Sequence, residues 1–178
     1  MKLRAGVFAG GLAIALPLFV GAYKVWSQNE NTDWQPAKNI APEGLMEQVI
    51  EENVNPGFEV QADEMQVLRV FLHNQADPLY LIDSRIADSG TEAESLCGAL
   101  GCAFFGYVQT DEGYQSVLNI YLDPSLPPDV YLIDSSNVLQ NDMPELIVHQ
   151  LENEQLLQMK LVLSSDRYEV VETQYLPK

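Results

Sequence analysis

Basic residues are scarce in this sequence. Of 178 residues, 9 are Lys or Arg and 26 are Asp or Glu, which gives a formal net charge of −17. Proteins that bind nucleic acid gather Lys and Arg against the phosphates. Here no base falls between Lys38 and Arg69 or between Arg85 and Lys160. The composition therefore argues against a nucleic-acid partner and against attraction to anionic lipid, and it is typical of a soluble acidic surface.

Histidine and cysteine are also scarce, with 2 of each. A zinc site needs about four ligands, which would have to include both His73 and His149. The sequence has no Gly-rich phosphate loop, no G-x-S-x-G elbow and no EF-hand spacing. We therefore predict no metal site and no cofactor.

Charge is absent from residues 5–23, which follow Lys2 and Arg4. As a helix this segment would rise about 28 Å, close to the ~30 Å thickness of a bilayer core. The preceding bases place the N-terminus in the cytoplasm, so the rest of the chain is exported. Two alternatives remain, a retained membrane anchor, which we favour, and a signal peptide cleaved near Ala22. The domain then lies in the periplasm, a lumen or outside the cell, anchored or secreted.

Three regions follow from this pattern. Residues 1–26 form the signal or anchor segment, and residues 27–41 are a polar spacer without periodicity. Residues 42–178 form a single exported domain. Its first element is a short amphipathic helix after Gly44, with apolar residues at helical spacing up to Val54.

The rest of the domain reads mainly as strands. Residues 67–72 and 79–82 flank a turn at residues 74–78, which predicts a hairpin. Residues 145–160 fit two strands around a turn at 152–154, or alternatively one helix, and we choose strands. We expect an α+β fold, mainly of antiparallel β-sheet, with the N-terminal helix packed on it.

A sequence echo suggests two repeated strand–loop–hairpin units. The letters YLIDS at 80–84 recur at 131–135, and a Tyr-containing hairpin at 105–122 resembles the one at 160–176. Either a unit of about fifty residues is duplicated, or two ordinary hairpins coincide. We favour duplication.

Two positions stand out for chemistry. Cys97 and Cys102 form an even pair in an exported chain, which favours a disulfide over a redox pair or a metal site. Asp83 and Asp134 each end a YLID strand, where a carboxylate could cap a loop or contact a ligand. These four residues are our candidate site residues, and none is assigned as catalytic.

Several short motifs resemble secreted bacterial proteins of uncharacterised function. These proteins carry a C-G-x-x-G-C motif that runs straight into a strand. The matching motifs are LYLID (79–83), CGALGC (97–102) with AFFGYV, GYQSV (113–117), MPELIV (143–148) and DRYEVV (166–171). The turn aspartates of that group are only partly matched, at residues 74–78. The resemblance implies a β-rich fold and an inner disulfide, and it implies no activity.

Three functions compete at this stage. The first is an exported, membrane-anchored accessory or binding protein with a protein partner at the membrane. The second is a hydrolase that uses the carboxylates of Asp83 and Asp134, which would have to converge in one cleft. The third is a thiol-based redox sensor at Cys97 and Cys102. The spacer and the lack of a catalytic motif favour the first.

Overall fold

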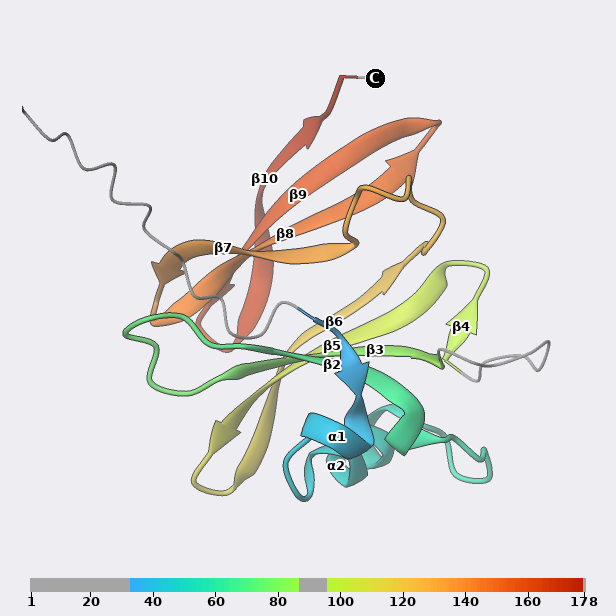
Figure 1. Cartoon of the computed structure of the whole chain (residues 1–178), viewed down its shortest axis with the longest axis vertical. Helices are drawn as coiled ribbons and strands as arrows, with labels where there is room; N and C mark the ends of the chain where they lie inside the picture. The colour runs from blue at the N-terminus through green and yellow to red at the C-terminus, as the bar shows by residue number, and fades with distance from the viewer. Residues whose placement is uncertain (1–32, 87–95, 178) are drawn as a thin grey trace, which may run out of the picture.

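A computed structural model describes residues 33–86 and 96–177 of the chain (Figure 1). The predicted apolar segment at residues 5–23 lies outside these residues. Within the described part, no helix is long and apolar enough to cross a membrane.

Antiparallel strands make up most of the described chain, as the sequence predicts. The first sheet holds β1 (Gln35–Pro36), β2 (Met65–Val70), β3 (Leu79–Ile86), β4 (Cys97–Gly98), β5 (Gly101–Thr110) and β6 (Gly113–Leu122). The second holds β7 (Ile133–Gln140), β8 (Met143–Glu152), β9 (Gln155–Ser164) and β10 (Arg167–Tyr175). The helices are α1 (Ala37–Ile40), α2 (Leu45–Asn53) and the 3₁₀ turn η1 (Ala62–Glu64).

Both sheets are built from sequential neighbours. In the first sheet the strands lie side by side in the order β1, β2, β3, β5, and β6 pairs with the other edge of β5. The short strand β4 forms a small hairpin with the beginning of β5. The second sheet is a four-stranded meander in the order β10-β9-β8-β7. Figure 1 shows the second sheet, in orange and red, above the first sheet, with both helices below it.

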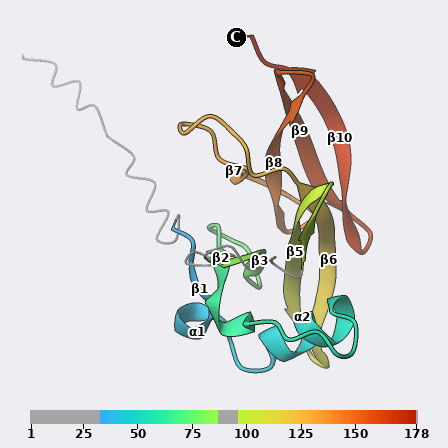
Figure 2. The ribbon, with the colours of Figure 1, turned by 90° about the vertical axis from the view of Figure 1, so that its right-hand side faces the viewer.

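The first sheet is the middle of three layers. Its buried side chains alternate between two faces because successive residues of a strand point in opposite directions. The face toward the second sheet carries Leu68, Leu79, Leu81, Phe104 and Leu118. The face toward the helices carries Val67, Tyr80, Ile82, Phe105 and Tyr107. The central strands β3 and β5 are therefore apolar on both sides, and Figure 2 shows the helices beside them at the lower end of the molecule.

The predicted N-terminal helix is α2, and it packs on the first sheet. Gly44 precedes it in the left-handed conformation, with φ 81°, where glycine carries no steric penalty. Leu45 and Val49 are fully buried against the sheet. Glu47 lies in the first turn, where a negative charge favours the helix dipole.

The polar spacer predicted at residues 27–41 is in part structured. From Trp34 onward the chain packs on the first sheet. Gln35 and Pro36 pair with β2, and Ala37 at the beginning of α1 is buried. The sequence did not predict this packing, because the side chains involved are isolated among polar residues and form no periodic pattern.

Residues 145–160 form strands β8 and β9, which confirms the choice of strands over a helix. Their connecting turn has Asn153 and Glu154 at φ 49° and 63°. The β7–β8 turn has Asn141 and Asp142 at φ 54° and 62°. Two positive φ values in a two-residue turn match the right-handed twist of hairpin strands, and among residues with a Cβ, Asn and Asp tolerate them best.

The two YLIDS copies occupy different places in the fold. The first lies in β3, a central strand with β2 and β5 as neighbours. In the second copy Ile133 begins β7, an edge strand whose one partner among the described strands is β8. The Tyr-containing segments, by contrast, both form hairpins, β5–β6 and β9–β10. The echo therefore marks similar local structure in sheets with different pairing.

Two buried tyrosines make stability sensitive to alkaline pH. The Tyr107 hydroxyl donates to Glu52 Oε2 at 2.7 Å, and the Tyr168 hydroxyl donates to the Pro144 carbonyl at 2.7 Å. Burial raises the pKa of both hydroxyls above the ordinary value of 10.0. The folded state therefore keeps these protons at a pH where the unfolded chain releases them. Their contribution to stability is complete below about pH 10 and is lost as pH rises above it.

We expect the free energy of unfolding to fall above about pH 10, by up to ~1.4 kcal/mol per pH unit for each tyrosine. Urea unfolding at several alkaline pH values measures this slope. Tyr168→Phe should make it shallower, whereas Tyr131→Phe, which changes an exposed side chain, should leave it unchanged. Equal slopes in all three proteins would contradict the assignment.

Candidate functional site: a cavity under the connector

The chain crosses from the first sheet to the second through a proline-rich connector, residues 123–132. Ser125 N–H donates to the Asp123 carboxylate at 2.9 Å, which lowers the pKa of that carboxyl. Val130 N–H donates to the Pro127 carbonyl at 3.0 Å. Proline fixes its own φ, so these turns hold the connector in a defined path.

A cavity of about 360 Å³ lies between the connector and the first sheet. We call it the connector cavity. The connector side is lined by Pro124, Leu126, Pro127, Pro128, Val130, Tyr131 and Leu132, followed by Ile133 at the beginning of β7. The opposite side is lined by Trp34, Gln66, Asp83, Arg85 and Phe104. Its volume is at the lower end of the ~300–1,000 Å³ typical of small-molecule sites.

Sheet register sets the floor of the connector cavity. Gln66 on β2 is the register partner of Asp83 on β3, and Asp83 is the partner of Phe104 on β5. Directly opposed residues share one face of a sheet, so the three side chains form a row across three strands. The row lies on the face that carries Leu81 and looks toward the second sheet.

An ion pair lies in this floor. Asp83 is 4% exposed, and its carboxylate accepts hydrogen bonds from Arg85 Nε at 2.9 and 2.8 Å. Arg85 Nη2 contacts the same carboxylate, and the Arg85 backbone N–H donates to it at 3.0 Å. Bidentate guanidinium–carboxylate contacts are strong and directional. The carboxylate that the sequence suggested as a ligand contact is thus held by its own neighbour.

Aromatic rings flank the ion pair. Arg85 Cζ lies 5.5 Å from the centre of the Phe104 ring, a cation–π distance. The indole of Trp34 meets the same ring edge to face, with 6.3 Å between the ring centres. The connector side of the cavity is therefore mainly apolar, and the sheet side combines aromatic rings with an ion pair and an amide.

Asp134 does not share this site. Ile133 lines the connector cavity and is buried, whereas the following residue, Asp134, is exposed and belongs to the opposite face of β7. Its carboxylate accepts a hydrogen bond from Ser135 N–H at 2.8 Å. The two candidate carboxylates therefore do not converge in this cavity.

The predicted disulfide is confirmed. Cys97 and Cys102 are bonded, with 3.9 Å between their Cα atoms, and they are register partners in the β4–β5 hairpin. Cys102 is buried and belongs to the core between the sheets. The bridge therefore fixes the beginning of β5, two residues before Phe104.

Neither histidine belongs to a cluster of metal-ligating side chains among the described residues. His149 Nδ1 lies 2.8 Å from the Tyr131 carbonyl, and its Nε2 lies 2.8 Å from Gln158 Nε2. His73 is exposed. No group of three or more His, Cys, Asp or Glu side chains suited to a metal ion occurs in the described ranges, 33–86 and 96–177.

Sequence reasoning found Asp83 but missed Trp34, Phe104 and Arg85. A signal for Arg85 was present, because residues two apart on a strand share a face and Asp83 and Arg85 carry opposite charges. Trp34 had no comparable signal, since it stands alone among polar residues. Phe104 was hidden in an apolar run whose two faces the sequence cannot tell apart.

Comparison with protein-family models, with curated proteins and with solved structures gives no match. The resemblance to secreted bacterial proteins therefore stays a prediction from short motifs.

Proposed function

We propose that this chain is an exported binding module, held at a membrane by residues 5–23 or released from it, that binds a small ligand in the connector cavity. The observation that carries this proposal is the combination of a preformed cavity with aromatic rings and a buried, fixed ion pair. Binding sites typically join an apolar lining to a few well-placed polar groups.

The charge of the lining indicates a neutral ligand. Among the described lining residues Asp83 and Arg85 are the charged ones, and they neutralise each other. A charged ligand would lose hydration without gaining a free counter-ion, which is costly in a partly buried site. A neutral ligand loses less hydration on entering the cavity.

The mixture of surfaces indicates a polyhydroxylated ligand, such as a saccharide. Trp34 and Tyr131 offer ring surfaces on which the apolar face of a sugar ring can lie. The amide of Gln66 can exchange hydrogen bonds with hydroxyl groups, and the Asp83 carboxylate can accept them. The proposal extends the predicted binding role to a named site and ligand class.

The same geometry favours binding over the alternative of a carboxylate-dependent hydrolase. A paired-acid mechanism needs two carboxyl groups that flank one bond. Asp83 is engaged by Arg85, and Asp134 belongs to the opposite face of β7 from the cavity-lining Ile133. The hydrolase and the thiol sensor remain hypotheses that carry less support than the binding module.

Tryptophan fluorescence tests the proposal directly. The chain has 2 tryptophans, so Trp26→Phe leaves Trp34 as the sole reporter. In this background we expect neutral mono- and oligosaccharides to shift or quench the emission to saturation. Uronic acids and amino sugars should do so much less. A flat signal across the neutral panel would refute the ligand class.

A matched pair of variants locates the site. Trp34→Leu should weaken binding by about tenfold or more, because aromatic anchors dominate such sites. Calorimetry measures this loss, since the reporter itself is removed. The control is Phe71→Leu, which changes an exposed ring that lies under Arg69 at 5.7 Å and outside the connector cavity. Equal losses in the two variants would contradict the assignment.

A further inference from the structure

Strand β6 forms an edge of the first sheet. It pairs with β5 on one side, and no described strand pairs with its other side. Proteins usually guard such edges with proline, charge or a bulge that turns the edge away. The residues of β6, GYQSVLNIYL, include neither proline nor a charged residue, although the pairing with β5 shifts register between Gly106 and Tyr107.

The other described edges are guarded differently. Edge strand β1 contains Pro36, and β7 contains Asp134 near its beginning. Edge strand β10 contains Glu169 and Glu172. Among these strands β6 is the best suited to pair with an added strand.

One residue of β6 already shows how an added strand would bind. The Tyr114 N–H donates to Gln48 Oε1 at 3.1 Å, and Gln48 Nε2 donates to the Tyr114 carbonyl at 2.5 Å. A residue of a neighbouring antiparallel strand would make the same two bonds. The backbone groups of Tyr114 therefore point away from β5, and by alternation those of Ser116 do so as well.

A groove continues from Ser116 along the strand. A cavity of about 460 Å³ lies between β6 and the beginning of β10. Residues 116–120 of β6 line one side. Leu161, Tyr168 and Val170 of the second sheet line the other, with Asp166 and Arg167 at the β9–β10 turn. The groove therefore offers apolar contacts next to an unpaired backbone, which is the arrangement that binds extended peptides by strand addition.

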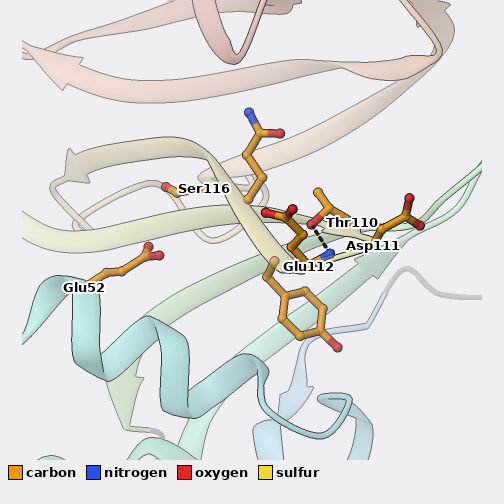
Figure 3. A pocket seen from close by; sticks show the side chains of 7 residues that line it. Glu52, Thr110, Asp111, Glu112 and Ser116 are labelled. Carbon is orange, nitrogen blue, oxygen red and sulfur yellow. Dashed lines mark hydrogen bonds between the residues drawn. The ribbon is translucent and has the colours of Figure 1, made fainter.

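The other end of the strand is acidic. A hollow of about 690 Å³ is lined by Glu52, Asp111 and Glu112, and it meets the groove at Ser116, which lines both. Figure 3 shows Glu52 on α2 and Ser116 at one end of this hollow, and Asp111 and Glu112 at the β5–β6 turn at the other. None of the three carboxylates forms an ion pair with a residue of the described ranges.

Glu52 is nevertheless held in place. Its carboxylate accepts hydrogen bonds from the Tyr107 hydroxyl at 2.7 Å and from Gln48 Nε2 at 2.7 Å. Both donors are neutral, so the charge is positioned but not balanced. A Lys or Arg side chain of a bound segment would balance it.

We infer that the outer edge of β6 binds an extended segment of a partner protein that carries basic side chains. The segment adds as a strand beside Ser116, places apolar residues in the groove, and directs its basic residues to Glu52, Asp111 and Glu112. A second copy of this chain is a poor occupant, because 26 acidic and 9 basic residues make copies repel each other. This surface is separate from the connector cavity, so the two proposals stand independently.

Binding of two synthetic peptides to the whole exported domain tests the inference. Both have about ten residues of alternating Val and Thr. One carries two Lys near one end, and the other carries two Glu at the same positions. We expect the Lys peptide to bind about tenfold more tightly or better, with affinity that falls as salt rises. It should also slow hydrogen exchange of the Ser116 amide. A lack of preference for Lys, or slowed exchange confined to β7 or β10, would overturn the inference.

Charge reversal provides the matched variants. The double variant Asp111→Lys with Glu112→Lys should lower the affinity for the Lys peptide by about tenfold or more. Asp142→Lys with Glu154→Lys makes the same change in charge in two turns of the second sheet and should have little effect. Equal losses in both double variants would show general attraction to an acidic protein and would overturn the site.

A backbone variant separates strand addition from charge. Ser116→Pro removes the outward N–H and keeps the bonds to β5, a position where an edge strand tolerates proline. We expect it to lower the affinity for the Lys peptide by about tenfold. Unchanged affinity in the folded variant would exclude strand addition. If the variant does not fold, the exchange measurement on the unchanged protein decides the question.

Discussion

Replacing Gly101 with alanine is expected to destabilise the fold by on the order of 3–5 kcal/mol. Gly101 begins β5 with φ 103°, a conformation that residues with a Cβ rarely adopt. A Cβ at this position would lie 2.2 Å from the Leu122 carbonyl oxygen and 2.7 Å from Asp123 N. Both contacts are with backbone, so the end of β6 would have to move.

Gly98 is the matched control for this variant. It lies in the same disulfide-closed hairpin, and a Cβ there would meet no heavy atom within 4 Å. Gly98→Ala should therefore change the free energy of unfolding by about 0.5 kcal/mol or less. Urea unfolding of both variants measures the difference. Similar changes in the free energy of unfolding for the two variants would contradict the close contact between Gly101 and the end of β6.

Truncation of either central phenylalanine is expected to cost about 3–5 kcal/mol, a large part of a typical domain's stability of ~5–15 kcal/mol. Phe104 is 1% exposed and Phe105 2% exposed, and they are neighbours on β5. Phe104 packs between the two sheets, and Phe105 packs under the helices. Alanine leaves a cavity in one layer in each case.

The two variants should differ in where the structure loosens. Phe105→Ala should speed hydrogen exchange in α2, whose Leu45 and Val49 share its cluster. Phe104→Ala should speed exchange in the second sheet, around Leu146 and Leu161. Identical exchange patterns in the two variants would contradict the three-layer arrangement.

Elements with strong local signals could be predicted from the sequence. The helical spacing after Gly44 predicted α2, and the turn residues between apolar runs predicted the hairpins. The cysteine pair gave the disulfide, because a bridge over so short a loop depends on local geometry. In each case the deciding interactions lie within a few residues of each other.

Interactions between distant segments could not be predicted. The shared letters YLIDS suggested equivalent strands, but β3 became central and β7 became an edge. The position of a strand in its sheet depends on which other strands pair with its two edges. The local sequence alone does not specify those partners. The docking of Trp34 against Phe104 likewise joins two segments about 70 residues apart in sequence (residues 34 and 104), beyond the reach of a periodic pattern.

The candidate site illustrates the same limit. The prediction singled out Asp83 by its repeat partner Asp134, whereas the structure pairs it with Arg85 and encloses it with the connector. Opposite charges two residues apart on a strand were a usable local signal. The connector's position over β3 was not, because it depends on how the second sheet packs on the first.

The central claim is that the connector and the first sheet enclose a site for a neutral, polyhydroxylated ligand. Nuclear magnetic resonance of the isotopically labelled protein, titrated with the saccharide panel, tests it most directly. We expect a binding sugar to shift the indole N–H of Trp34, the Nε–H of Arg85 and the amides of Leu126 and residues 129–132, to saturation. Absence of shifts with every sugar, or shifts confined to β6 and the acidic hollow, would contradict the claim.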